Sequence, residues 1–114
     1  MESKMTVRMT FMAYKPEALA TNIQNNDSRE EAAKLAIESA GGTFLGFYGL
    51  VGQDHHVVVI SDFEDATDYM SVVGKVMMGG ATSDIKTVTC YTGAEAKIAM
   101  AKATGNDINY TPPS

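Results

Sequence analysis

Apolar and polar positions alternate along the first regular segment of the chain, residues 5–14. One set of alternate positions is strongly apolar and comprises Met5, Val7, Met9, Phe11 and Ala13. A period of two predicts a β-strand with one apolar face, and Pro16 ends it because proline has no amide proton to give to a sheet. Residues 17–26 are ambiguous: Pro16 can open a short helical turn through Ala20, but the polar residues that follow favour a surface loop.

A helix is expected over residues 28–40. Ser28 and Glu31 have the spacing of a capping box, in which each side chain binds the other residue's backbone amide. Gly41-Gly42 ends the helix, because a left-handed residue after a helix favours glycine. The inward stripe is expected to comprise Ala32, Leu35, Ala36, Ser39 and Ala40.

Two strands are predicted next, over residues 43–50 and 55–61. The first is rich in aromatic residues and is interrupted by Gly46 and Gly49, which indicate a bulge or a close approach of backbone. The second is apolar on both faces over residues 57–60, as expected of a central strand that is covered on both sides. Since about four residues join these strands, they are predicted to form a hairpin.

The second half of the chain repeats this alternation of helix and strand. A helix is expected from Asp65 to Gly79-Gly80, with a stripe formed by Ala66, Tyr69, Met70, Val73, Val76 and Met77. Residues 84–91 predict a fourth strand. Thr92 is expected to cap a third helix, with Glu95 at its third position, and this helix ends near Gly105.

The order of these elements predicts an α+β fold. Two βαβ crossovers in this order give the ferredoxin-like βαββαβ plait, with an antiparallel four-stranded sheet and two helices on one face. We expect a single domain over residues 1–105 and an extended tail over residues 106–114. The second face of the sheet is apolar and has no cover, so a homodimer or higher homo-oligomer through this face is expected.

From residue 5 to about residue 102 the chain resembles the GYD-domain family of the dimeric α/β-barrel superfamily. The resemblance rests on the helix ending in Ala40-Gly41-Gly42, on Phe47-Tyr48 followed by Gly52 and a valine-rich strand, and on the closing strand 87–92. The family is named for a Gly, a Tyr and an Asp, usually with one residue between Gly and Tyr. Gly52 matches the glycine, while Asp54 stands at the tyrosine position and His55 at the aspartate position.

This resemblance implies a fold and a dimer more than an activity. A shift of one residue would keep Asp54 as the acid but would place Gln53 at the tyrosine position. The wider superfamily includes haem-degrading and cofactor-free monooxygenases, chlorite dismutases and muconolactone-type isomerases. The resemblance is therefore compatible with an enzyme as well as with a binding protein or a purely structural one.

Composition and charge exclude several classes of protein. The chain has 114 residues, of which 45% are hydrophobic and 20% charged, so it is a globular domain rather than a disordered segment. With 9 Lys and Arg against 14 Asp and Glu, it has no basic face for nucleic acid or an anionic membrane. One cysteine excludes an intrachain disulfide, and the start of the chain has no apolar signal segment. We expect a cytoplasmic protein.

The candidate chemistry centres on Asp54-His55-His56. Adjacent histidines on a strand point to opposite faces, so either is a candidate catalytic base, unless both simply begin a strand at its polar rim. They cannot together ligate one metal, and the number of ligands is too low for a metal site. No cofactor is expected.

Tyrosine, arginine and methionine supply the candidate binding groups. Tyr14 and Tyr48 are candidate ligand-binding residues together with Asp54 and Arg8, whereas Tyr69 and Tyr91 belong to the same tyrosine set. Each tyrosine also suits packing, and Arg8 also suits a structural salt bridge. The 8 methionines fill a core or line a small apolar cavity between helices and sheet.

Three functions remain open. The first is a homodimer that binds a small apolar or aromatic molecule. The second is a cofactor-independent monooxygenase or isomerase, with His55 or His56 as base and Tyr48 or Tyr14 orienting the substrate. The third is a purely structural oligomerisation module. A histidine inside a cavity would favour the second, and a filled interior would favour the third.

Overall fold

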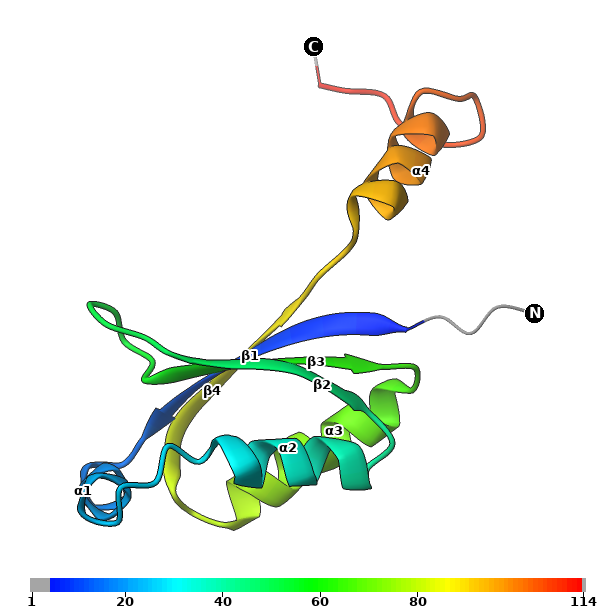
Figure 1. The fold of residues 1–114 in the computed structure, drawn as a ribbon. Helices are drawn as coiled ribbons and strands as arrows, with labels where there is room; N and C mark the ends of the chain where they lie inside the picture. The colour runs from blue at the N-terminus through cyan, green and yellow to red at the C-terminus, as the bar shows by residue number, and fades with distance from the viewer. Residues whose placement is uncertain (1–4, 114) are drawn as a thin grey trace.

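The computed structural model describes residues 5–113 of the chain. Four strands and four helices follow one another along it (Figure 1): β1 (Thr6–Tyr14), α1 (Pro16–Gln24), α2 (Glu30–Ser39), β2 (Thr43–Gly49), β3 (Val57–Phe63), α3 (Ala66–Met78), β4 (Thr82–Thr89) and α4 (Gly93–Ala103).

The strands form one antiparallel sheet in the order β2-β3-β1-β4. Helices α2 and α3 lie side by side beneath one face of this sheet, and none of the helices within residues 5–113 covers the other face (Figure 1). The chain therefore has the expected ferredoxin-like α+β arrangement. The apolar segment 57–60 lies in β3, an inner strand of the sheet, as its sequence predicts.

Side chains from the sheet and from both helices form the core. Its buried residues are Met12, Ile37, Val57, Val59, Phe63 and Tyr69. The expected inward stripe of α2 is wrong in one respect, because Leu35 is 71% exposed and Ile37 is the buried residue. These two positions lie two residues apart, on opposite sides of a helix with 3.6 residues per turn, so only one of them can face the sheet. In α3, Met70 and Met77 are likewise exposed, and Val72 packs on the core instead.

The predictions for residues 17–40 need two corrections. Residues 17–24 are helical rather than a loop, because Pro16 occupies the first turn of α1, where its missing amide proton costs nothing. The capping box of Ser28 and Glu31 is absent, since α2 begins only at Glu30. There Arg29 has a left-handed backbone, and the Asp27 carboxylate accepts hydrogen bonds from its amide and its guanidinium.

The other helix boundaries follow the sequence signals. The Asp65 carboxylate accepts a hydrogen bond from the amide of Thr67 at the start of α3. Thr92 and Glu95 form the predicted capping box of α4. Gly41 follows α2 with φ of 93°, which glycine adopts without strain. The register between β2 and β3 shifts between Phe44 and Gly46, so the expected irregularity in this hairpin is confirmed.

Helix α4 stands apart from the rest of the molecule. It projects from the end of β4, well away from α2 and α3 (Figure 1). The radius of gyration is 17.8 Å, whereas a compact chain of this length has about 13 Å. Apolar residues of this segment, such as Ile98, Met100 and Tyr110, are exposed as a result. None of the helices within residues 5–113 is long and apolar enough to cross a bilayer.

Candidate functional site: a cavity between the helices and the sheet

A cavity of about 350 Å³ lies between the sheet and the two helices that cover it. Six small side chains form much of its helical walls: Ala32, Ala33 and Ala36 from α2 and Val72, Val73 and Val76 from α3; the larger Ile37, Tyr69 and Lys75 also line it. Alanine favours the helix but reaches only one carbon from the backbone. The sequence of α2 thus forms a helix that leaves space over the middle of the sheet.

Hydroxyl groups lie together at the part of the cavity near Tyr69. The Tyr69 hydroxyl is 2.6 Å from Thr10 Oγ1 and 2.7 Å from Thr87 Oγ1. Thr10 and Thr87 face each other in the register of β1 and β4. Ser61, which is 1% exposed, lines the same cavity as Thr10 and Tyr69. An otherwise apolar cavity therefore contains a few converging polar groups, as small-molecule sites do.

Arg8 lies beside this cluster. Its guanidinium carbon is 4.9 Å from the centre of the Tyr69 ring, a cation–π contact. Arg8 does not line the cavity, and the expected salt bridge is not found among residues 5–113. Its Nη1 is buried without a hydrogen-bond partner among these residues.

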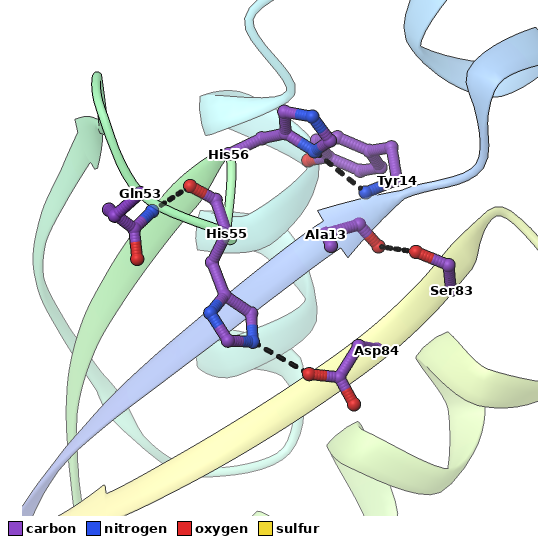
Figure 2. Close-up of polar contacts among 7 residues, drawn as sticks. All are labelled: Ala13, Tyr14, Gln53, His55, His56, Ser83 and Asp84. Carbon is purple, nitrogen blue, oxygen red and sulfur yellow. Dashed lines mark hydrogen bonds and ion pairs between the residues drawn. The ribbon is translucent and has the colours of Figure 1, made fainter.

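Tyr14 and His56 come together beside the far part of the cavity. Figure 2 shows their rings stacked, with centres 6.0 Å apart, and the Tyr14 amide donating to His56 Nδ1 at 3.0 Å. That bond occupies the Nδ1 lone pair, so the neutral imidazole carries its proton on Nε2 and acts as a donor. Burial raises the pKa of the Tyr14 hydroxyl above its ordinary value of 10.0; the Arg29 guanidinium opposes this and the Asp27 carboxylate adds to it. Tyr14 is therefore a neutral donor at physiological pH.

Tyr14 also joins the cavity to a second, more open depression. This depression, of about 760 Å³, is lined by residues of α1 and by His56, whereas the first cavity is not. It is wider and flatter, so it would bury less of a bound molecule. The first cavity, which is less open and mainly apolar, is the better candidate site for that reason.

His55 lies on the opposite face of the sheet from His56. Its Nε2 contacts an Asp84 carboxylate oxygen (Figure 2), at a distance of 2.7 Å. Its ring also lies edge-on to that of Phe11, with ring centres 6.0 Å apart. The Gln53 side chain also donates to the His55 carbonyl. Because Asp84 is well exposed, this contact is worth at most about 1 kcal/mol.

The other candidate residues do not join the cavity. Tyr48 is 61% exposed and pairs with Val58 on the open face of the sheet. Asp54 is exposed in the turn between β2 and β3. Of the six candidates, only Tyr14 lines the cavity, with Arg8 and His56 each touching one of its lining residues.

Sequence reasoning did not single out Thr10, Ser61 or Thr87, and it left Tyr69 as one tyrosine among four. The available signal was the presence of hydroxyl residues on the helix-facing sides of three strands. Only the strand register shows that these residues meet, because neighbours in a sheet are distant along the chain. Within residues 5–113, no three His, Cys, Asp or Glu side chains gather where they could hold a metal ion.

An antiparallel sheet covered by two helices, with a cavity beneath it, defines a small ferredoxin-like α+β domain. Two solved structures share this fold. A Bacteriodes thetaiotaomicron VPI-5482 protein named as a putative antibiotic biosynthesis monooxygenase has 17% identity and a TM-score of 0.52, over 79% of this chain and 90% of its own. An uncharacterized NIPSNAP-like domain protein from Burkholderia xenovorans has 13% identity and a TM-score of 0.50, over 98% of this chain and 92% of its own. Identities this low show the fold alone.

The family model of the GYD domain matches residues 9–100. The chain belongs to the GYD-domain family. No match is found among curated proteins. The positions that correspond to the family's Gly, Tyr and Asp are Gly52, Asp54 and His55. They lie in the turn between β2 and β3, where Gly52 has φ of 81°. None of Gly52, Asp54 and His55 lines the cavity.

Proposed function

We propose that this protein is a homodimer that binds a small, mainly apolar molecule in the cavity between α2, α3 and the sheet. The observation that carries the proposal is a cavity of about 350 Å³ with alanine and valine walls. Ligand sites in proteins fall in the range of roughly 300–1,000 Å³. A space at the lower end of that range suits a molecule of one or two rings or a short alkyl chain.

The uncovered face of the sheet supports the dimer. It carries apolar side chains from three adjacent strands, including Met9, Phe11, Ile60 and Val88. A contiguous apolar face of this kind is costly to leave in water and marks an interaction surface. A second copy of the chain offers the same apolar face and would cover it.

The positions of the histidines favour binding over histidine-based catalysis. Neither His55 nor His56 lines the cavity. Because the Tyr14 amide donates to His56 Nδ1, the proton of the neutral imidazole lies on Nε2. Neither ring nitrogen then has a free lone pair with which to act as a base. His55 lies on the other face of the sheet, against Phe11 and Asp84.

Binding is tested with a fluorescent naphthalene that bears a dimethylamino group and a propyl chain, called here the alkyl probe. We expect saturable binding with enhanced emission, because the probe leaves water for an apolar space. Ala36→Leu should weaken binding at least tenfold, since the added carbons occupy the cavity. Ala20→Leu, the same change on the exposed side of α1, should leave binding unchanged.

Two results would contradict the binding proposal. One is the lack of saturable binding by the wild-type protein, which would favour a purely structural module. The other is equal affinity in the wild type and in Ala36→Leu, which would place the probe outside the cavity.

The dimer is tested by sedimentation equilibrium at micromolar concentration. We expect a dimer for the wild type, and at least tenfold weaker association for Val88→Asp, because an unpaired carboxylate would be buried in the interface. Thr89→Asp adds the same charge at the next residue of β4, on the other side of the strand, and should associate like the wild type. A wild-type monomer, or identical behaviour of both variants, would contradict this interface.

A further inference from the structure

The hydroxyl cluster at one part of the cavity contains a proton that its own hydrogen bonds do not use. Thr10, Tyr69 and Thr87 carry three hydroxyl protons, and their oxygens are joined by two hydrogen bonds of 2.6 and 2.7 Å. Each of these bonds uses one proton, so one proton remains for a further acceptor. Among the hydrogen bonds of residues 5–113, none from these three hydroxyls goes to another group.

The spare proton reaches the cavity in two of the three possible arrangements of these bonds. Thr10 and Tyr69 line the cavity, whereas Thr87 does not. If Tyr69 accepts from both threonines, its own proton is free, and if the bonds run from Thr87 through Tyr69 to Thr10, the free proton is on Thr10. Both of these place a donor at the cavity surface, where the buried Ser61 also lies. In the third arrangement the bonds run from Thr10 through Tyr69 to Thr87, and a ligand acceptor in the cavity favours the first two over this one.

Arg8 strengthens this donor without entering the cavity. Its guanidinium carbon is 4.9 Å from the centre of the Tyr69 ring. A positive charge at the face of a phenol ring favours negative charge on its oxygen, and so favours donation of the phenolic proton. Because Arg8 does not line the cavity, its charge acts through Tyr69 and not on a ligand directly.

We propose that this cluster recognises a carbonyl oxygen on an otherwise apolar ligand. The inference rests on the proposed binding function and deepens it by naming the chemical class of the ligand. A carbonyl accepts a hydrogen bond and donates none, which matches a cluster with a spare proton. A carboxylate would need a cation beside it when buried, and the cations that line the cavity, Arg29 and Lys75, are exposed side chains.

The proposal is tested with two matched probes. The ketone probe is 2-dimethylamino-6-propionylnaphthalene, and the alkyl probe has a methylene in place of its carbonyl. Removing one hydrogen bond weakens binding by about 3–10-fold. Tyr69→Phe should therefore lower the affinity for the ketone probe by this factor and keep the affinity for the alkyl probe within about twofold of the wild type. The emission of the bound ketone probe should also move to shorter wavelength, because its excited state loses a hydrogen bond.

Tyr48→Phe is the matched control. It removes the hydroxyl of a tyrosine that is 61% exposed on the open face of the sheet, and it should alter neither probe. Thr10→Val removes another hydroxyl of the cluster while keeping the side-chain shape. Because Tyr69 can still donate after this change, Thr10→Val is combined with Tyr69→Phe. The double variant has no cavity-lining hydroxyl of the cluster and should weaken binding of the ketone probe selectively.

The outcomes separate this inference from the proposed function. If the double variant Tyr69→Phe/Thr10→Val weakens the binding of both probes equally, or of neither, carbonyl recognition is overturned while binding in the cavity stands. If neither probe binds the wild type in a manner sensitive to Ala36→Leu, both the binding function and the carbonyl inference fall.

Discussion

Filling the cavity from α2 should stabilise the protein. Ala36 lines the cavity, and replacing it with leucine adds three carbon atoms to a space of about 350 Å³. Each buried methylene is worth roughly 0.8 kcal/mol, which gives at most about 2.4 kcal/mol. Ordering a leucine side chain costs about 0.5–1 kcal/mol. Alanine and leucine have nearly equal helix propensity, so we expect a net gain of about 1.5 kcal/mol.

The assay is equilibrium unfolding in urea with no ligand added. Wild type and Ala36→Leu are compared at one protein concentration, because association stabilises a folded chain by mass action. The expected result is a higher midpoint with an unchanged denaturant slope. Ala20→Leu, on an exposed position of α1, should change the stability by less than about 0.5 kcal/mol.

The opposite result has a clear meaning. If the cavity were already filled by side chains in solution, leucine would force its neighbours apart, and overpacking costs about 1–3 kcal/mol. Destabilisation by Ala36→Leu, with Ala20→Leu neutral, would therefore refute the cavity and the binding function together.

Two further predictions test local features of the fold. Gly42→Ala should destabilise the protein by about 1–3 kcal/mol in urea unfolding, because its Cβ would lie 2.5 Å from the buried Phe63 ring. Gly49→Ala is the control, since a Cβ there meets nothing within 4 Å. An equal loss of stability in both variants would contradict this explanation. Hydrogen bonds from Thr67 hold the pKa of the Asp65 carboxyl below its ordinary value of 3.8, so its charge stabilises the fold above about pH 4 and that contribution is lost as the pH falls through the lowered pKa. Asp65→Asn keeps a capping oxygen without the charge, so its urea midpoint should be lower than that of the wild type at pH 7. This difference should shrink as the pH falls below about 4, and a difference that stays constant would contradict the reasoning.

The elements that the sequence predicted correctly are those with local causes. Four predictions each depend on residues within one strand or one turn: the alternation in β1, the apolar run in β3, the start of a helix at Asp65, and the capping box of Thr92 and Glu95. Such signals suffice for the order of strands and helices. The order in turn limits the topology to the ferredoxin-like plait, because crossover connections have a fixed hand.

The face that α2 turns to the sheet could not be predicted in the same way. Leu35 and Ile37 are both apolar, and the alanines around them satisfy either rotation of the helix. Packing buries Ile37 and leaves Leu35 exposed. The start of α2 is a similar case, because Ser28 and Glu31 fit a capping box, but the left-handed turn at Arg29 delays the helix.

Only the tertiary structure determined which residues form the candidate site. Sequence reasoning chose residues for their chemistry, and of its six candidates only Tyr14 lines the cavity. Thr10, Tyr69 and Thr87 are separated by 59 and 18 residues along the chain, yet their hydroxyls lie within hydrogen-bond distance. Sheet register and the placement of α3 bring them together. By itself the sequence determined which segments form strands and helices, since short-range contacts control these; which side chains share a cavity was decided by long-range packing.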